Sequence, residues 1–122
     1  MNRFVLTTII AVILDQITKF IVRTHFSFTK NYGAAFGILQ GWKWLFIIVS
    51  FFVIGFILYY KDKTKGFSYY GLILLFSGTI GNLIDRLVFG YVRDFIDLGF
   101  WPSFNLADSF NTVGVILLII YF

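Results

Sequence analysis

Four long apolar stretches constrain the fold of this chain more than any other feature of its sequence. They cover residues 4–22, 44–60, 67–89 and 104–122. A helix needs roughly 20 residues to cross a hydrocarbon core of about 30 Å, and each stretch is close to that length. The runs are uninterrupted, whereas the strands of a membrane barrel alternate apolar and polar residues. We therefore predict an all-α membrane protein with four transmembrane helices, forming a single domain over residues 1–122.

The composition agrees with a membrane protein, because 59% of the residues are hydrophobic, 13% are charged and the mean hydropathy is +0.87. Soluble domains have far more charge. Aromatic residues mark the ends of the apolar stretches, as in an interfacial belt: Trp42, Trp44, Tyr59, Tyr60, Tyr69, Tyr70, Tyr91, Trp101 and Tyr121. No small-residue cleavage site follows the first stretch, so we expect it to remain as an uncleaved span. The chain has no cysteine, which excludes disulfides, thiolate nucleophiles and thiolate metal ligands.

The basic residues predict an orientation in the membrane. Lys61, Lys63 and Lys65 lie in one short loop, "KDKTKG", and short cytoplasmic loops carry such an excess of lysine. This loop also accounts for much of the formal net charge of +4, so we do not expect nucleic acid as a partner. With the loop inside, the N-terminus is inside, and the loops near residues 23–43 and 90–103 lie outside.

Five of the six acidic residues should gather toward one membrane face, because the helices alternate in direction: Asp15, Asp85, Asp94, Asp97 and Asp108. An ionised side chain at the centre of a membrane helix raises the free energy of insertion by about 2.5–3.5 kcal/mol. These groups must therefore be ion-paired, in contact with water or at the membrane interface. Asp15 and Lys19 are four residues apart on one helical face, and so are Asn82 and Arg86. One interpretation is that Asp15, Lys19, Asp85 and Arg86 form ion pairs that hold the helices together.

The segment before the fourth stretch suggests chemistry. Asn105 with Asp108 three residues later resembles a capping box, so both residues could simply start a helix. However, "VRDFIDL" places Asp94 and Asp97 just before this helix, and Gly99 and Pro102 allow the chain to turn back toward Asp108. Two carboxylates brought together at a low-dielectric edge share a proton. Such a pair can hydrolyse a peptide without a covalent intermediate, although the chemistry does not choose between Asp94 and Asp97.

Four sequence blocks resemble the prolipoprotein signal peptidase family, signal peptidase II, in the order of that family. They are "DQITKF" (residues 15–20), "NYGAAFGIL" (31–39), "GNLIDRLVFGYVRDFIDL" (81–98) and "PSFNLADSFNTVG" (102–114). The resemblance implies a multi-pass aspartic endopeptidase of the bacterial cytoplasmic (inner) membrane, with its active site at the extracytoplasmic face. Such an enzyme cleaves lipid-modified prolipoproteins just before the lipidated cysteine and needs no metal or organic cofactor. Its partners would be the prolipoprotein substrate and membrane lipids, and we expect a monomer.

The resemblance also implies residue roles, which are expectations at this point. It chooses Asp94, with Asp108, as the catalytic pair. The family's residues that bind substrate or support the pair fall on Asp15, Lys19, Asn31, Gly33, Asn82, Asp85, Arg86 and Asn105. Small residues in "GAAFG" (33–37) would let a substrate strand approach a short extracytoplasmic cradle, or would only allow a tight turn into the next helix.

Two other functions fit a four-span chain. A small ion channel or transporter would use the aspartates to bind a cation or relay protons, but its essential acid tends to be solitary and near mid-membrane. A bundle or assembly factor without chemistry would make every aspartate a structural ion pair, which leaves the loop acids without partners.

Overall fold

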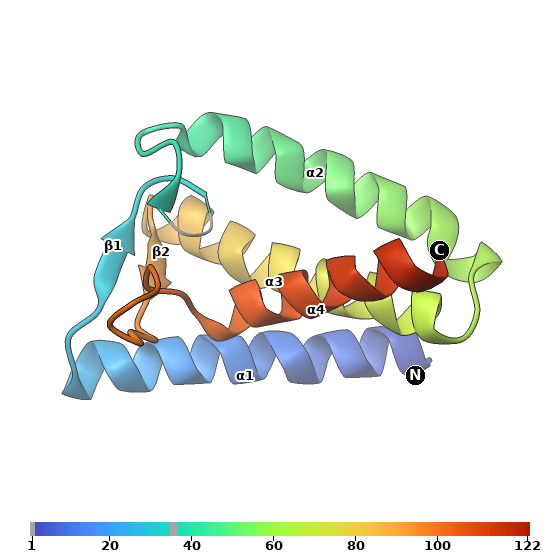
Figure 1. Ribbon diagram of the computed structural model, residues 1–122, viewed down its shortest axis with the longest axis horizontal. Helices are drawn as coiled ribbons and strands as arrows, with labels where there is room; N and C mark the ends of the chain where they lie inside the picture. The colour runs from blue at the N-terminus through green and yellow to red at the C-terminus, as the bar shows by residue number, and fades with distance from the viewer. Residues whose placement is uncertain (1, 35–36) are drawn as a thin grey trace.

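The computed structural model describes residues 2–34 and 37–122; Ala35 and Phe36 of the small-residue loop lie outside the described residues. Its helices are α1 (Arg3–His25), α2 (Lys43–Tyr60), α3 (Phe67–Val88) and α4 (Leu106–Tyr121), with a short 3-10 turn, η2 (Lys61–Lys63). Two short strands, β1 (Thr29–Asn31) and β2 (Val92–Asp94), lie at one end of the bundle, and both chain termini lie at the other (Figure 1). The helices agree with the predicted all-α membrane architecture.

The first three helices are long and apolar enough to cross a membrane, whereas α4 is shorter. Its 16 residues span about 24 Å at 1.5 Å per residue. The helix is shorter than the apolar stretch 104–122 because Phe104 forms a β-bridge with Ile96 and Asn105 caps the helix. Non-helical backbone is tolerated at this depth where protein covers it, and Asn105 is fully buried.

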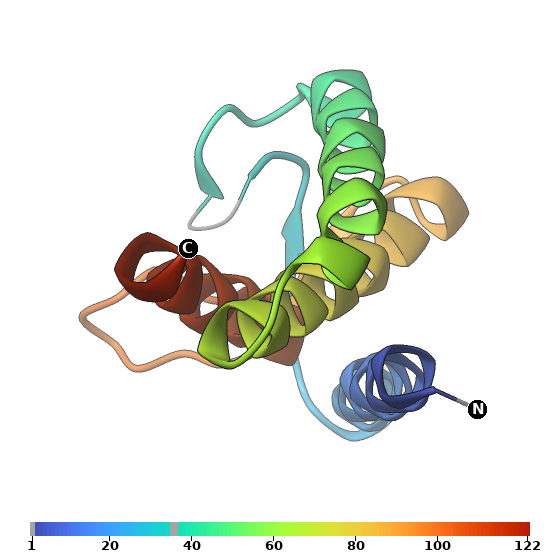
Figure 2. The same cartoon turned by 90° about the vertical axis from the view of Figure 1, so that its right-hand side faces the viewer.

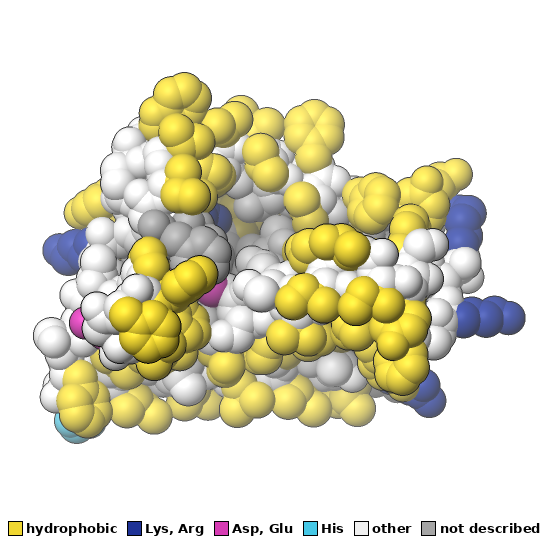
Figure 3. Space-filling view, viewed as in Figure 1, with side chains coloured by type: hydrophobic (Ala, Val, Ile, Leu, Met, Phe, Trp, Pro, Cys, Tyr) yellow, Lys and Arg dark blue, Asp and Glu magenta, His cyan; other side chains and the backbone are white. Residues whose placement is uncertain are grey.

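The centre of the bundle is α3. It packs most extensively against α4 and also contacts α1 and α2 (Figure 2). The apolar core includes Phe4, Ile57, Leu72 and Ile73, which come from α1, α2 and α3. Apolar side chains also cover much of the outer surface (Figure 3), as expected for helices that face lipid. Because α3 is central, its buried polar residues, among them Asn82 and Asp85, lie where they can contact the neighbouring helices.

Glycines allow α3 and α4 to approach each other closely. A Cβ added to Gly114 would lie 2.7 Å from the backbone N of Leu75 and 2.8 Å from the carbonyl O of Gly71. Membrane helices use such small residues to pack backbone against backbone. Here the close approach brings Asn82, near the end of α3, to Asp108, at the start of α4.

The two strands were not predicted from the sequence. They pair antiparallel, with Thr29 opposite Asp94, Lys30 opposite Arg93 and Asn31 opposite Val92. Each strand has only three residues, too few for an alternating pattern to be recognised. Their pairing brings the loop after α1 to the segment after α3 and places Asn31 beside Asp94.

Candidate active site

The carboxylates of Asp94 and Asp108 are held by one residue, Asn105. Asp94 ends β2 and Asp108 lies in the first turn of α4, and their side chains are almost fully buried (2% and 5% exposed). Asn105 Nδ2 donates a hydrogen bond to Asp94 Oδ1 (2.9 Å), and the Asn105 backbone N donates to Asp108 Oδ2 (3.1 Å). The predicted capping box is confirmed, because the Asp108 N also donates to Asn105 Oδ1 (2.9 Å). The cap therefore organises both acids.

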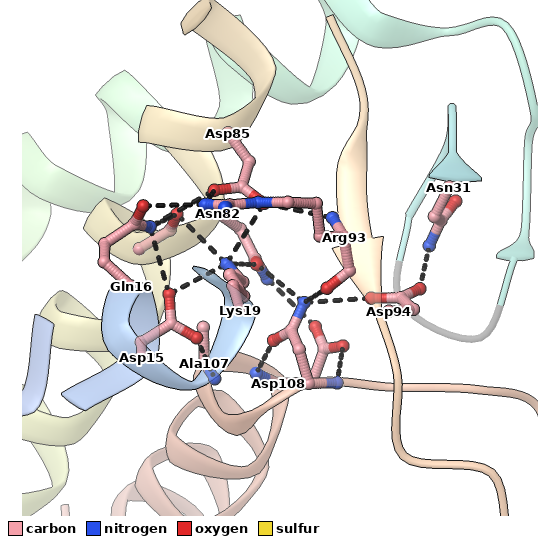
Figure 4. Close-up of polar contacts among 12 residues, drawn as sticks. Asp15, Gln16, Lys19, Asn31, Asn82, Asp85, Arg93, Asp94, Ala107 and Asp108 are labelled. Atoms are coloured by element: carbon pink, nitrogen blue, oxygen red, sulfur yellow. Dashed lines mark hydrogen bonds and ion pairs between the residues drawn. The ribbon is translucent and has the colours of Figure 1, made fainter. Parts of the chain in front are cut away.

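Two further asparagines hold the remaining carboxylate oxygens (Figure 4). Asn31 Nδ2 donates to Asp94 Oδ2 (2.9 Å), and Asn82 Nδ2 donates to Asp108 Oδ1 (2.9 Å). Asn105 Nδ2 also reaches Asn82 Oδ1 (3.0 Å), which links the two halves of the site. Each of the four oxygens thus accepts an N–H from a neutral group, and both carboxylates belong to one network.

Burial and the neighbouring Asp108 raise the pKa of Asp94 to about 7. Removing a carboxylate from water disfavours its charged form, and a second acid nearby adds repulsion. Hydrogen bonds from Asn31 and Asn105 and the charge of Lys19 act in the opposite direction. The result is a carboxyl group that changes its protonation state near neutral pH.

Behind the acids, Lys19 joins α1 to α3, and its ion-pair partner Asp15 reaches α4. Its Nζ lies 2.8 Å from Asp15 Oδ2 and 3.4 Å from Asp85 Oδ2, and it donates to Asn82 Oδ1 (3.1 Å). Asp15 Oδ1 accepts from the backbone N of Ala107 (2.9 Å), at the start of α4. The predicted ion pairs of Asp15, Lys19 and Asp85 are confirmed, and they fix α1, α3 and α4 relative to one another.

The predicted ion pair of Arg86 is absent from the described residues. Arg86 Nη2 instead donates to the carbonyl O of Gly33 (3.1 Å), and its guanidinium lies 5.4 Å from the ring centroid of Phe46. The loop turns back tightly at Gly33, where an added Cβ would lie 2.7 Å from the carbonyl O of Leu39. Arg86 therefore contacts the loop after β1, and Gly33 contacts its own loop.

Sequence reasoning missed Arg93 and Gln16. Arg93 forms a two-point contact with Asp85, from Nε to Oδ2 (3.1 Å) and from Nη2 to Oδ1 (2.9 Å), and its backbone N donates to Oδ2 (3.0 Å). Gln16 Oε1 accepts from Arg93 Nη2 (2.8 Å). Gln16 could have been found as the polar neighbour of Asp15 in an apolar run. Arg93 lies in the loop near residues 90–103 that was predicted to be outside, and nothing in its spacing indicates burial.

Gln40 was also missed. Its Nε2 donates to Asn31 Oδ1 (2.7 Å), so it orients the amide that holds Asp94. No sequence signal indicates this contact, because it depends on the loop that returns toward β1.

Asp97, the alternative to Asp94, lies apart from the site. It is exposed and accepts a hydrogen bond from the backbone N of Gly99 (2.9 Å), where the chain turns. The turn predicted at Gly99 is present, with a φ of 85°. Of the two candidate acids, the turn therefore brings Asp94 into the network with Asp108.

Hollows border both carboxylates. Asp94 lines one of about 270 Å³, together with Asn31 and Gln40. Asp108 lines a second hollow of about 240 Å³ between α2, α3 and α4, and a third of about 250 Å³ on the outer side of α4. Within residues 2–34 and 37–122, no group of three or more acidic or histidine side chains is arranged to hold a metal ion.

The fold and the site define a helical membrane protein with a buried carboxylate pair near one end of its bundle. The model of the family described as signal peptidase (SPase) II matches residues 7–122. The chain therefore belongs to the signal peptidase II family and is a peptidase, so the channel interpretation is not favoured.

Similar proteins agree with this assignment. The lipoprotein signal peptidase of Halothermothrix orenii is 41% identical, over 95% of this chain and 92% of the relative. That of Streptococcus pyogenes serotype M5 is also 41% identical, over 96% and 90%. Two solved structures of a bacterial membrane enzyme are each 37% identical and cover 96% of this chain. They have TM-scores of 0.89 and 0.82, with 85% and 90% of their own chains covered.

Proposed function

We propose that this peptidase removes signal peptides from lipid-modified prolipoproteins, cleaving just before the lipidated cysteine, with Asp94 and Asp108 as its catalytic pair. The relatives are named lipoprotein signal peptidases. One observation carries the assignment of the pair: Asn105 donates to both carboxylates from its side chain and its backbone. A neutral donor of this kind holds two acids together and leaves the proton between them available.

In the proposed reaction the pair begins with one proton. The ionised carboxylate takes a proton from water, and the resulting hydroxide attacks the scissile carbonyl carbon. The protonated carboxyl group donates to the carbonyl oxygen, which stabilises the charge that develops there. As the tetrahedral intermediate collapses, the C–N bond breaks and the nitrogen takes a proton from the pair. The products are a carboxylic acid and a free amine, and no cofactor enters the balance.

The other predicted residues support this chemistry without touching the reacting atoms. Asn31 and Asn82 orient the two carboxylates, and Lys19 balances the charge of Asp15 and Asp85. Arg86 of α3 lines the hollow beside Asp108 and donates to the carbonyl O of Gly33, so it attaches the loop after β1 next to the proposed substrate route.

The proposed location is the bacterial cytoplasmic membrane, with the site at the extracytoplasmic face. The lysine-rich turn η2 and the strands lie at opposite ends of the bundle (Figure 1), so a cytoplasmic η2 puts Asp94 outside. The exposed apolar sides would contact lipid, and the acyl chains of the substrate would stay there. All residues of the site come from one chain, which supports a monomer.

Asparagine substitutions at three acids test the function. Asp94→Asn and Asp108→Asn should each lower cleavage of a lipid-modified precursor in membranes at least about 100-fold, because each removes acid–base chemistry. Asp97→Asn is the matched control and should cleave like the parent, since Asp97 is exposed outside the network. Full cleavage by either Asp94→Asn or Asp108→Asn would reject the catalytic pair.

A further inference from the structure

The hollow between α2, α3 and α4 continues from Asp108 into the membrane-spanning part of the bundle. It is lined near the acid by Asn82 and Arg86 and further along by apolar residues of α2. Two polar residues, Thr79 of α3 and Asn111 of α4, also line it. Neither has a role in the site described above, and neither is needed to hold a carboxylate.

Thr79 and Asn111 lie at the same depth. Thr79 precedes Asn82 by three residues, and Asn111 follows Asp108 by three residues on an antiparallel helix. Because Asn82 and Asp108 are hydrogen-bonded, a rise of 1.5 Å per residue places both residues about 4.5 Å further into the bundle. The packing agrees, since a Cβ added to Gly78, next to Thr79, would overlap the Asn111 side chain.

Among the described residues, neither side chain forms a hydrogen bond, although Thr79 is buried and Asn111 is half-buried. Thr79 is 8% exposed, and Asn111 Oδ1 is a fully buried acceptor without a partner. Nearby hydroxyls behave differently: Ser77 Oγ and Ser50 Oγ each donate to the carbonyl O four residues earlier (2.7 Å). Buried polar groups are nearly always paired, so two unpaired ones on facing helices indicate a ligand.

We propose that Thr79 and Asn111 form a subsite that binds the peptide backbone of the substrate on the signal-peptide side of the scissile bond. This inference rests on the proposed function. A peptide must be extended where it is cleaved, and its N–H and C=O groups then lack partners in a low-dielectric environment. A hydroxyl and a carboxamide can each donate and accept, so together they match one extended peptide unit. The signal-peptide side is indicated because the hollow runs from Asp108 into the bilayer, where that segment remains.

The test compares variants that remove hydrogen bonding and keep volume. Thr79→Val and Asn111→Leu in the full chain should each raise KM for a synthetic diacylated lipopeptide in mixed micelles by about 2- to 10-fold, the factor for one lost hydrogen bond. The kcat should change less than KM, since both residues lie away from the reacting atoms. Thr79→Ser, which keeps the hydroxyl, should restore KM.

Thr8→Val is the matched control. The Thr8 hydroxyl is also buried and has no partner in the described part of the chain, but it lies on α1, outside this hollow. Its removal should leave KM unchanged. Tm should not fall in any of these valine or leucine variants, because each removes an unsatisfied polar group. Parental KM in both Thr79→Val and Asn111→Leu would overturn the subsite, and so would an equal rise in Thr8→Val.

A second set of substrates tests whether the subsite binds the peptide backbone of the substrate or its side chains. Replacing single backbone amides of the lipopeptide by esters, one at a time on the signal-peptide side, removes one N–H each. At one position the ester should raise KM in the parent and have little further effect in Asn111→Leu or Thr79→Val. If the ester and the residue substitution raise KM independently of each other at every position, the subsite does not bind the peptide backbone. If Asp94→Asn and Asp108→Asn lose cleavage while these KM values stay parental, only the subsite fails.

Discussion

At the scale of single residues, the site separates neutral contacts from charged ones. Asp94 and Asp108 accept hydrogen bonds from asparagine side chains and one backbone N–H, whereas Lys19 and Arg93 form their ion pairs with Asp15 and Asp85. A cation in direct contact with the pair would favour ionisation of both members and remove their shared proton. Lys19 and Arg93 are paired with the other acids, and Arg86 donates to the carbonyl O of Gly33. Among the described residues no cation therefore contacts the pair directly, and the pair can keep one proton at neutral pH.

This arrangement predicts how activity depends on pH. Burial and Asp108 raise the pKa of Asp94 to about 7, so the singly protonated pair persists up to that pH. Above it the last proton is lost, and kcat/KM should fall about tenfold per pH unit; at low pH both carboxyls are protonated and activity should fall again. A pH–rate profile on a lipopeptide substrate measures both limbs. A rate that stays constant from pH 6 to 9 would contradict a shared proton, and Asp97→Asn should leave the profile unchanged.

Arg93 is predicted to position Asp94 through Asp85. Its side chain and that of Asp85 are almost completely buried, and removing one partner of a buried ion pair costs about 3–5 kcal/mol. Arg93→Met should therefore lower Tm and reduce kcat more than KM, because β2 loses its side-chain contacts with α3 and keeps only the backbone hydrogen bond to Asp85. Thermal unfolding in detergent and steady-state kinetics measure the two effects.

Lys30 provides the control for Arg93, since it lies opposite Arg93 in the strand pair but is exposed. Lys30→Met should cost less than about 1 kcal/mol, as exposed charges contribute little. Equal destabilisation by the two substitutions would show that Arg93 has no special role.

At the scale of elements, the position of Asp108 depends on how closely α3 and α4 pack. Gly114 lies against the backbone of Gly71 and Leu75, in the half of the interface furthest from the acids. A larger residue there would separate the helices and stretch the hydrogen bond between Asn82 and Asp108. The glycines of this interface therefore affect the site from a distance.

Gly114→Ala tests this dependence. The added methyl group meets backbone atoms, which cannot move aside as a side chain does, so we expect a loss of about 1–3 kcal/mol and lower kcat. Gly55→Ala in α2 is the matched control, because apart from its own helical backbone no described atom lies within 4 Å of its added Cβ. It should be neutral or stabilise the helix by roughly 0.5–1 kcal/mol. An unchanged Tm in Gly114→Ala would contradict the close packing.

The elements also show what could be predicted from the sequence. The helices follow from long apolar runs, and the Asp15–Lys19 pair and the Asn105 cap follow from local spacing. The pairing of β1 with β2 joins residues more than sixty positions apart, and local patterns do not encode such contacts. The contacts of Arg93 with Gln16 and of Gln40 with Asn31 likewise join separate segments of the chain, and were missed for this reason. The family motifs identified Asp94 as the partner of Asp108, whereas chemistry alone could not choose between Asp94 and Asp97.

At the scale of the whole molecule, apolar and charged side chains occupy different parts of the bundle surface. Apolar side chains cover the sides of the helices, and Lys and Arg side chains lie toward its two ends (Figure 3). The lysines of η2 and the segment after it are at the end that holds both termini, and the carboxylate pair is at the other (Figure 1). The proposed function, on an exported, lipid-modified protein, predicts that the second end faces outward.

The orientation can be measured directly because the chain has no cysteine. Phe100→Cys, at a residue 83% exposed between β2 and α4, should react with a membrane-impermeant maleimide in intact spheroplasts. Asp62→Cys, in η2, should react only after the membrane is opened; it keeps all three lysines of the loop, and acidic residues contribute little to orientation. The unsubstituted chain should not be labelled. Reaction of Asp62→Cys but not Phe100→Cys in intact spheroplasts would place Asp94 and Asp108 on the cytoplasmic side, where a peptidase for exported lipoproteins could not reach its scissile bond.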